Sequence, residues 1–167
     1  MIRYARSGDH AAIDALNTAA FAGPVESRLV TRLRADEDVV FELVAEEAGK
    51  VAGHILFSRL WADRGELYAA LAPMSVRPDL QRGGLGSKLV RAGIDCAREF
   101  GVFGVLVLGH TAYYPRFGFS AAAAAQVRSP YSGSAAFMAL ALEENAFKAA
   151  LTVAYPDAFA GENAPAT

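Results

Sequence analysis

The fold of this chain is indicated by one segment, Val76-Arg77-Pro78-Asp79-Leu80-Gln81-Arg82-Gly83-Gly84-Leu85-Gly86-Ser87-Lys88-Leu89. Apolar residues precede the segment, glycines fill its middle, and an amphipathic stretch follows. This order predicts a strand, a tight turn and the start of a helix. The first amides of a helix have no partner inside it and lie at the positive end of its dipole. Because glycines let a phosphate approach those amides closely, the turn predicts a phosphate site.

Two other phosphate-binding loops do not fit these residues. In a Walker A loop, Ser or Thr directly follows a Gly-Lys pair, whereas Val51 follows Gly49-Lys50 here. A dinucleotide-binding fingerprint needs a third glycine, whereas Gly84-Leu85-Gly86-Ser87-Lys88-Leu89 ends in leucine. The turn is therefore of another kind.

The residues before the turn predict an antiparallel meander with two helices. Apolar patterns predict strands at 2–4, 39–45, 51–60 and 66–76, separated by polar turns. Ser7 or Asp9 is suited to cap a first helix, and Pro24 suits the first turn of a second.

The residues after the turn predict a parallel strand pair. An apolar helical stripe is expected from five residues: Leu85, Leu89, Gly93, Cys96 and Phe100. The nearly continuous apolar run 102–108 is typical of a strand buried on both faces, and a strand-helix-strand crossover implies a parallel pair. A short helix at 113–117 and a strand at 137–142 complete a mixed α/β sheet with helices on its faces.

Composition places the chain among ordinary globular domains. Its 167 residues suit one domain, for which we expect residues 1–160, with a frayed tail at 161–167. A net charge of −2 does not favour nucleic-acid binding, and no apolar run is long enough to predict a membrane span. A lone cysteine and a start without a signal-peptide pattern predict a cytoplasmic protein, and no metal site is expected.

Two motifs in order resemble the GNAT acetyltransferase superfamily. Gln81-x-x-Gly84-x-Gly86 resembles that family's Gln/Arg-x-x-Gly-x-Gly/Ala turn, and Tyr114-Pro115-Arg116-Phe117-Gly118-Phe119 resembles its Tyr-x-x-x-Gly-Phe element. The resemblance covers roughly residues 1–142 and is similar to a bacterial subgroup with unassigned substrates. It implies a mostly antiparallel sheet with helices on both faces and a parallel fourth and fifth strand pair.

The resemblance also implies a cofactor and a reaction. The cofactor is acetyl-CoA, and the acceptor is a primary amine of a small molecule or a protein that attacks the thioester directly. In this family the fourth and fifth strands splay apart to admit the pantetheine arm. Backbone groups of Met74, Ser75 and Val76 would face the arm, and the amides of residues 81–87 would hold the diphosphate.

The resemblance assigns the proton donor for the thiolate to Tyr114, because Gly118 lies four residues further on. Tyr113 is the neighbouring alternative. Many members carry an asparagine before this tyrosine, whereas this chain has Gly109-His110-Thr111-Ala112, so the contacts to the arm differ there.

The base that accepts the amine proton has three candidates. Glu26 begins the second helix near the family's acceptor site, His110 follows the strand 102–108, and His54 lies within an apolar strand. Cys96 is interpreted as a core residue, since acyl-cysteine chemistry needs an exposed, electropositive thiol.

Two other functions stay open at this point. A non-catalytic module on the same fold could bind acyl-CoA as a sensor, and a different nucleotide-phosphate binder could use the same helix terminus. The apolar segment 147–159 could support a homodimer edge.

Overall fold

The computed structural model describes residues 1–160. Its helices are α1 (His10–Phe21), α2 (Val25–Ala35) and α3 (Leu85–Glu99). Its strands are β1 (Ile2–Tyr4), β2 (Val39–Glu47), β3 (Lys50–Ala62), β4 (Tyr68–Val76), β5 (Gly104–Leu108), β6 (Val127–Arg128), β7 (Phe137–Ala141) and β8 (Leu151–Ala154). The tail expected at 161–167 lies outside the described residues.

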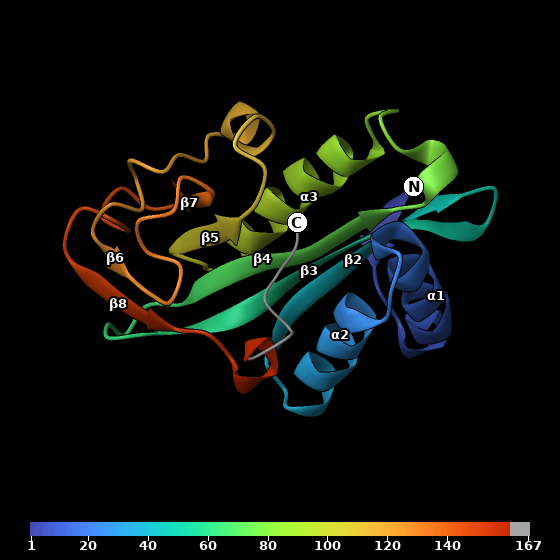
Figure 1. Cartoon of the computed structure of the whole chain (residues 1–167), viewed down its shortest axis with the longest axis horizontal. Coiled ribbons are helices and arrows are strands. Elements are labelled where there is room, and N and C mark those ends of the chain that lie inside the picture. Colours follow the sequence, from blue (N-terminus) through green and yellow to red (C-terminus); the bar gives the residue numbers. More distant parts are fainter. Residues whose placement is uncertain (161–167) are drawn as a thin grey trace.

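The main sheet has the strand order β1-β2-β3-β4-β5-β7 (Figure 1). All neighbours in it are antiparallel except β4 and β5, which run parallel. Helices α1 and α2 cover one face of the sheet, and α3 covers the other (Figure 1). The predicted mixed sheet, with its parallel fourth and fifth strands and helices on both faces, is confirmed.

Alternating residues of β3 fill the two cores. Leu56 packs with Leu29 and Leu33 of α2, whereas its neighbour Phe57 packs with Leu89 of α3. Successive side chains of a strand point to opposite faces, so one apolar strand supplies both layers. The mostly apolar pattern of 51–60 follows from this position in the sheet.

The buried face of α3 differs from the predicted stripe. Phe100 is 47% exposed, and Cys96 is only partly buried against the core. The fully covered residues of the helix are Leu89, Val90, Gly93, Ile94 and Ala97. The predicted stripe and the buried face share Leu89 and Gly93, but the buried face is rotated around the helix toward Val90, Ile94 and Ala97.

The C-terminal segment belongs to the core of its own chain. β8 pairs with the last two residues of β3, Trp61 and Ala62, and also with β6. Phe147, Leu151 and Phe159 are buried in two apolar clusters, so the apolar character of 147–159 is accounted for within one chain. No helix in residues 1–160 has the length and apolar character needed to cross a membrane.

Candidate active site

The glycine turn has the conformation that a phosphate site requires. Gly84 has φ +90°, in the left-handed region that favours glycine, and α3 begins at the next residue. Among residues 1–160, no side chain caps this helix start, and a Cβ added to Gly84 would meet no atom within 4 Å. The Gln81 side chain donates to the Val76 carbonyl at 3.1 Å and so ties the turn to the end of β4.

Strands β4 and β5 pair over three residues only. The parallel register joins Tyr68, Ala69 and Ala70 to residues 104–106. β4 then continues to Val76 with β3 as its partner, and in the described part of the chain the β5 side of this second half has no paired strand. Within residues 1–160, the backbone of residues 74–76 therefore has one edge that no strand pairs with, and the binding of the arm there stays a prediction.

A β-bulge lies where the two strands diverge. Ile55 pairs with Met74 and Phe57 pairs with Leu71, so Ala72 and Pro73 together oppose the single residue Leu56. A bulge re-aims the residues that follow it and increases the local twist. This bulge precedes the half of β4 that does not pair with β5.

Three segments meet in front of this open edge. The Tyr113 hydroxyl lies 3.2 Å from Ser87 Oγ, in the first turn of α3. A Cβ built on Gly86 would lie 3.2 Å from that hydroxyl and 3.6 Å from the Met74 side chain. The structure therefore brings together Met74, Gly86 and Ser87, which were predicted for the cofactor site. It also places the Tyr113 hydroxyl beside them.

Tyr114 occupies a different environment from its neighbour. Its side chain is 0% exposed, in the core beside Phe119, with ring centroids 5.7 Å apart. The residue begins a 3-10 turn, Tyr114–Phe117, and Tyr113 precedes that turn. The assignment of the proton donor to Tyr114 stays a prediction, whereas the phenol that contacts the first turn of α3 belongs to Tyr113.

Cationic side chains surround the mouth of this site. Arg82 and Lys88 are exposed on the turn and the first helical residues. The Arg116 guanidinium stacks over the Tyr113 ring at 4.6 Å and donates from Nε to the Tyr113 carbonyl at 3.0 Å. These positive charges suit a diphosphate bound at the helix start.

The three base candidates lie apart from one another. Glu26 is 8% exposed in the first turn of α2. His110 is exposed, and its backbone carbonyl accepts the amides of Tyr113 and Tyr114 at 3.1 and 3.3 Å. His54 is fully buried on the α1/α2 face, where Nε2 lies 2.8 Å from a carboxylate oxygen of Glu42.

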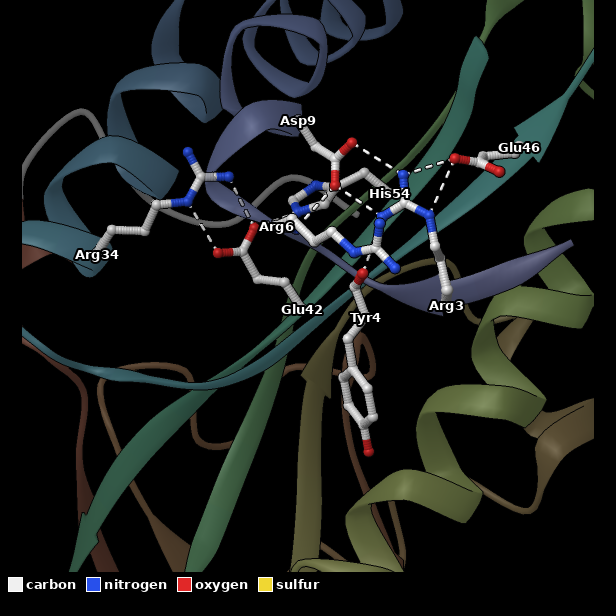
Figure 2. A network of polar contacts seen from close by, with 8 residues as sticks. All are labelled: Arg3, Tyr4, Arg6, Asp9, Arg34, Glu42, Glu46 and His54. Carbon is white, nitrogen blue, oxygen red and sulfur yellow. Dashed lines mark hydrogen bonds and ion pairs between the residues drawn. The ribbon is translucent and has the colours of Figure 1, made fainter. Parts of the chain in front are cut away.

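Sequence reasoning did not foresee the polar residues around His54. Arg34 binds both carboxylate oxygens of Glu42 at 2.8 Å, and Glu42 contacts His54 (Figure 2). Asn17 of α1 then lies between His54 and Ser75 of β4. Asn17 falls four residues after Ile13, on the buried face of its helix, so a polar residue at a core position was the available signal.

A second polar cluster lines a cavity away from this site. Arg3 binds Asp9 at 2.8 and 2.9 Å and Glu46 at 2.6 and 2.9 Å (Figure 2). The Asp9 carboxylate also accepts the Arg6 amide, and it makes no cap to α1 within the described residues. The cavity, of about 620 Å³, is lined by these three charged groups, Lys50, Arg77 and one face of α1. It contains none of the residues predicted for the cofactor.

Comparison with known proteins gives a consistent result. Residues 10–119 match the Acetyltransferase (GNAT) family. The chain is 42% identical to the uncharacterized N-acetyltransferase YjhQ of Escherichia coli (strain K12) over 117 residues, which cover 66% of this chain and 64% of that protein. It is 36% identical to the uncharacterized N-acetyltransferase YhbS of the same strain over 128 residues, which cover 75% of this chain and 77% of that protein.

Solved structures agree with the sequence matches. The crystal structure of YhbS from Escherichia coli in complex with CoA has a TM-score of 0.87 at 34% identity, covering 95% of this chain and 91% of that one. A GNAT family acetyltransferase from Brucella melitensis in complex with acetyl-CoA has a TM-score of 0.79 at 35% identity, covering 95% and 97%. The glycine turn, the divergent β4–β5 pair and these matches together show that the chain belongs to the GNAT family of acetyltransferases.

Proposed function

We propose that this protein transfers an acetyl group from acetyl-CoA to a primary amine of a small molecule or protein by direct attack. The observation that carries the proposal is the convergence of Met74, Gly86 and Tyr113 at the open half of β4. Relatives over 30% identical hold CoA and acetyl-CoA in their structures, which supports acetyl-CoA as the donor. A cytoplasmic location and a homodimer stay predictions.

The residues present fit the donor molecule. The first amides of α3 and the exposed Gly84 bind the diphosphate, with Arg82 and Lys88 as counter-charges. The open backbone edge of residues 74–76 binds the pantetheine arm. When bound, acetyl-CoA supplies the acetyl thioester on which the amine acts. A backbone amide of Met74 or Ser75 is the proposed donor to the developing oxyanion.

Tyr113 is the proposed proton donor to the departing thiolate. Its hydroxyl is already held at the first turn of α3, beside Ser87 and the Met74 side chain, whereas the Tyr114 side chain is enclosed in the core. Tyr113→Phe and Tyr114→Phe each remove one oxygen atom and form a matched pair. Because general acids contribute about 10²–10⁴-fold, Tyr113→Phe is expected to lower kcat by about that factor. A loss confined to Tyr114→Phe would return the role to Tyr114.

Glu26 and His110 stay the proposed residues for the base or the acceptor contact. Glu26 is the mostly buried carboxylate of α2, and His110 precedes the Tyr113 turn. His54 is a poor base, because its ring is fully buried and held by hydrogen bonds. Glu26→Gln and His110→Gln, compared over a pH series of kcat/KM, would separate the two.

Binding of the donor is tested by thermal unfolding with acetyl-CoA, CoA and ATP. A ligand that binds only the native state stabilises it by about 2.7 kcal/mol at a hundredfold excess over Kd, and so raises the temperature of the unfolding midpoint. We expect a rise with both CoA ligands and none with ATP, and the loss of that rise in Gly84→Glu. Gly133→Glu is the matched control, since Gly133 is also exposed with positive φ but lies in the loop before β7.

Each outcome of this experiment has a clear meaning. No rise with saturating acetyl-CoA would contradict the proposed function. Binding without turnover of any amine would favour the non-catalytic acyl-CoA sensor on the same fold.

A further inference from the structure

Five side chains form a continuous polar chain on the α1/α2 face of the sheet. Arg34 donates to Glu42 at 2.8 Å, and Glu42 contacts His54 Nε2 at 2.8 Å. His54 Nδ1 lies 3.5 Å from Asn17 Nδ2, and Asn17 Oδ1 accepts from the Ser75 hydroxyl at 2.6 Å. The chain joins α2, β2, β3, α1 and β4 in that order. Figure 2 shows its Arg34–Glu42–His54 part.

The direction of every hydrogen bond in this chain follows from the ion pair at one end. The ionised Glu42 only accepts, so His54 must carry its hydrogen on Nε2 and accept at Nδ1. Asn17 therefore turns its NH₂ group to His54 and its oxygen to Ser75. His54 and Asn17 are 0% exposed and Ser75 is 3% exposed, so water does not compete for these bonds.

The other end of the chain lies on the strand that forms the active site. Ser75 is next to Met74, in the half of β4 that has left β5. In the part of the chain that the structure describes, that half pairs with β3 on one side only, with Ser75 in register with His54. The Asn17–Ser75 bond adds an attachment from the helix layer to this stretch of strand.

We propose that Asn17 and His54 are positioning residues for acetyl transfer, which hold β4 at Ser75 so that its open edge keeps the orientation that binds the pantetheine arm. This rests on the proposed function. Neither residue is expected to touch the arm, because Asn17 and His54 contact β4 from the α1 face of the sheet, whereas the Met74 side chain lies by Gly86 on the α3 face. Their effect should therefore concern the arm and not the nucleotide half of CoA, which binds the glycine turn.

The pattern of donors and acceptors makes the polar chain sensitive to the protonation of His54. Burial lowers the pKa of His54, and Glu42 opposes that shift. The charged groups that face the ring are Glu42 from β2, Arg34 from α2 and Asp14 from α1. A second ring proton would place a donor on Nδ1 against the NH₂ group of Asn17, so the bonds keep this direction only while His54 is neutral, and a charged ring would require the Asn17 amide to turn over.

Asn17→Asp keeps the shape of the side chain, but its polar chain is intact only when one additional proton is bound. A carboxylate at this position accepts from Ser75 but faces the lone pair of His54 Nδ1. The variant recovers the bond only after taking up one proton, on the ring or on the new carboxyl. Its chain is therefore broken at high pH and restored at low pH.

The test measures the Kd of CoA and of its nucleotide half, which lacks the arm, by calorimetry across about pH 8 to about pH 5. In the wild type we expect the ratio of the two constants to stay nearly constant. In Asn17→Asp the CoA affinity should fall by about tenfold or more at the alkaline end and recover on acidification, since small misplacements of binding groups cost up to ~10²-fold. The nucleotide half should bind both proteins equally.

Ser58→Ala is the matched control. Ser58 lies on the same strand and face as His54, it is fully buried, and within residues 1–160 its hydroxyl has no hydrogen-bond partner. This variant should leave both Kd values unchanged. A CoA-to-nucleotide ratio that is identical in Asn17→Asp and the wild type at every pH would overturn the positioning role. Failure of the wild type to bind CoA would instead contradict the proposed function.

Nitrogen NMR of the histidine rings gives an independent readout. The protein has three histidines, and the signal that disappears in His54→Gln is that of the buried ring. We expect a neutral ring protonated at Nε2 in the wild type and a charged ring, or a raised His54 pKa, in Asn17→Asp. A neutral ring protonated at Nδ1 in the wild type would overturn the proposed direction of the chain.

Discussion

At the scale of single residues, the Glu42 carboxylate joins helix α2 to the sheet through Arg34 and His54. Burial alone would raise the pKa of this carboxyl, but hydrogen bonds from Arg34 and His54 outweigh it and lower the pKa to about 2. Its side chain is 8% exposed, so solvent screens these bonds little. Removal of the charge should therefore be felt in the stability of the whole domain.

Glu42→Gln should remove the part of the pH dependence of the free energy of unfolding that comes from the Glu42 carboxyl. The pKa falls from 4.5 to about 2 on folding, so the ionised carboxyl stabilises the protein above pH 4.5 and loses this effect as the pH falls through about 2. The stabilisation is at most about 3 kcal/mol. The difference in free energy of unfolding between wild type and variant, measured with urea, should shrink on acidification. Glu47→Gln, on an exposed residue of the same strand, should show no such trend.

At the scale of elements, the sequence predicted the order of strands and helices. It did not predict how each helical element is rotated about its axis, which decides the side chains that it buries. Glycine, proline and alternating apolar residues mark where an element begins and ends, so the β4-turn-α3 unit was predictable. Which of two adjacent tyrosines faces the α3 turn depends on how a 3-10 turn is rotated, and side chains there are separated by about 120°. Tyr113 and Tyr114 are equivalent on this criterion, and only the fold distinguishes them.

Gly93 marks the closest approach between α3 and the sheet. A Cβ there would lie 2.5 and 2.8 Å from ring atoms of Phe57, which is buried and stacked on Phe41 at 4.6 Å. Gly93→Ala gains about 1 kcal/mol of helix propensity but costs about 1–3 kcal/mol through overpacking. We expect a net loss of stability in chemical unfolding, and a variant more stable than wild type would contradict the packing. Gly101→Ala is unsuitable as a comparison because of its positive φ, so the difference between Asp95→Gly and Asp95→Ala, at an exposed position of the same helix, supplies the propensity term.

At the scale of the whole molecule, the C-terminal residues are the part that the sequence did not predict. Short strands such as β8, with four residues, give too little periodicity to be recognised. Their position depends on contacts with β3 and β6, far away in the chain. The polar chain through Asn17 and His54 has the same origin, since it joins residues that only the assembled layers bring together.

Alanine substitutions of two phenylalanines, one buried and one half exposed, test whether the C-terminal segment belongs to the core. Phe147 is 8% exposed and packs edge-on against Tyr68 at 5.6 Å, whereas Phe100 is 47% exposed. Phe147→Ala should cost about 3 kcal/mol or more, and Phe100→Ala should cost clearly less. Equal losses in the unfolding midpoint would contradict the assignment of the C-terminal segment to the core.

The short pairing between β4 and β5 also bears on how the protein avoids aggregation. Within the described residues, the second half of β4 pairs with β3 but has no strand on its β5 side, and such an open edge is a template for pairing with another chain. Sheets protect their edges with charges, prolines or bulges, and Pro73 with its bulge lies at the start of this open half. Charged side chains further along the edge would obstruct the pantetheine arm that we propose. The ligand then takes over the protection that the side chains cannot give, so the protein should remain soluble longest where acetyl-CoA is abundant.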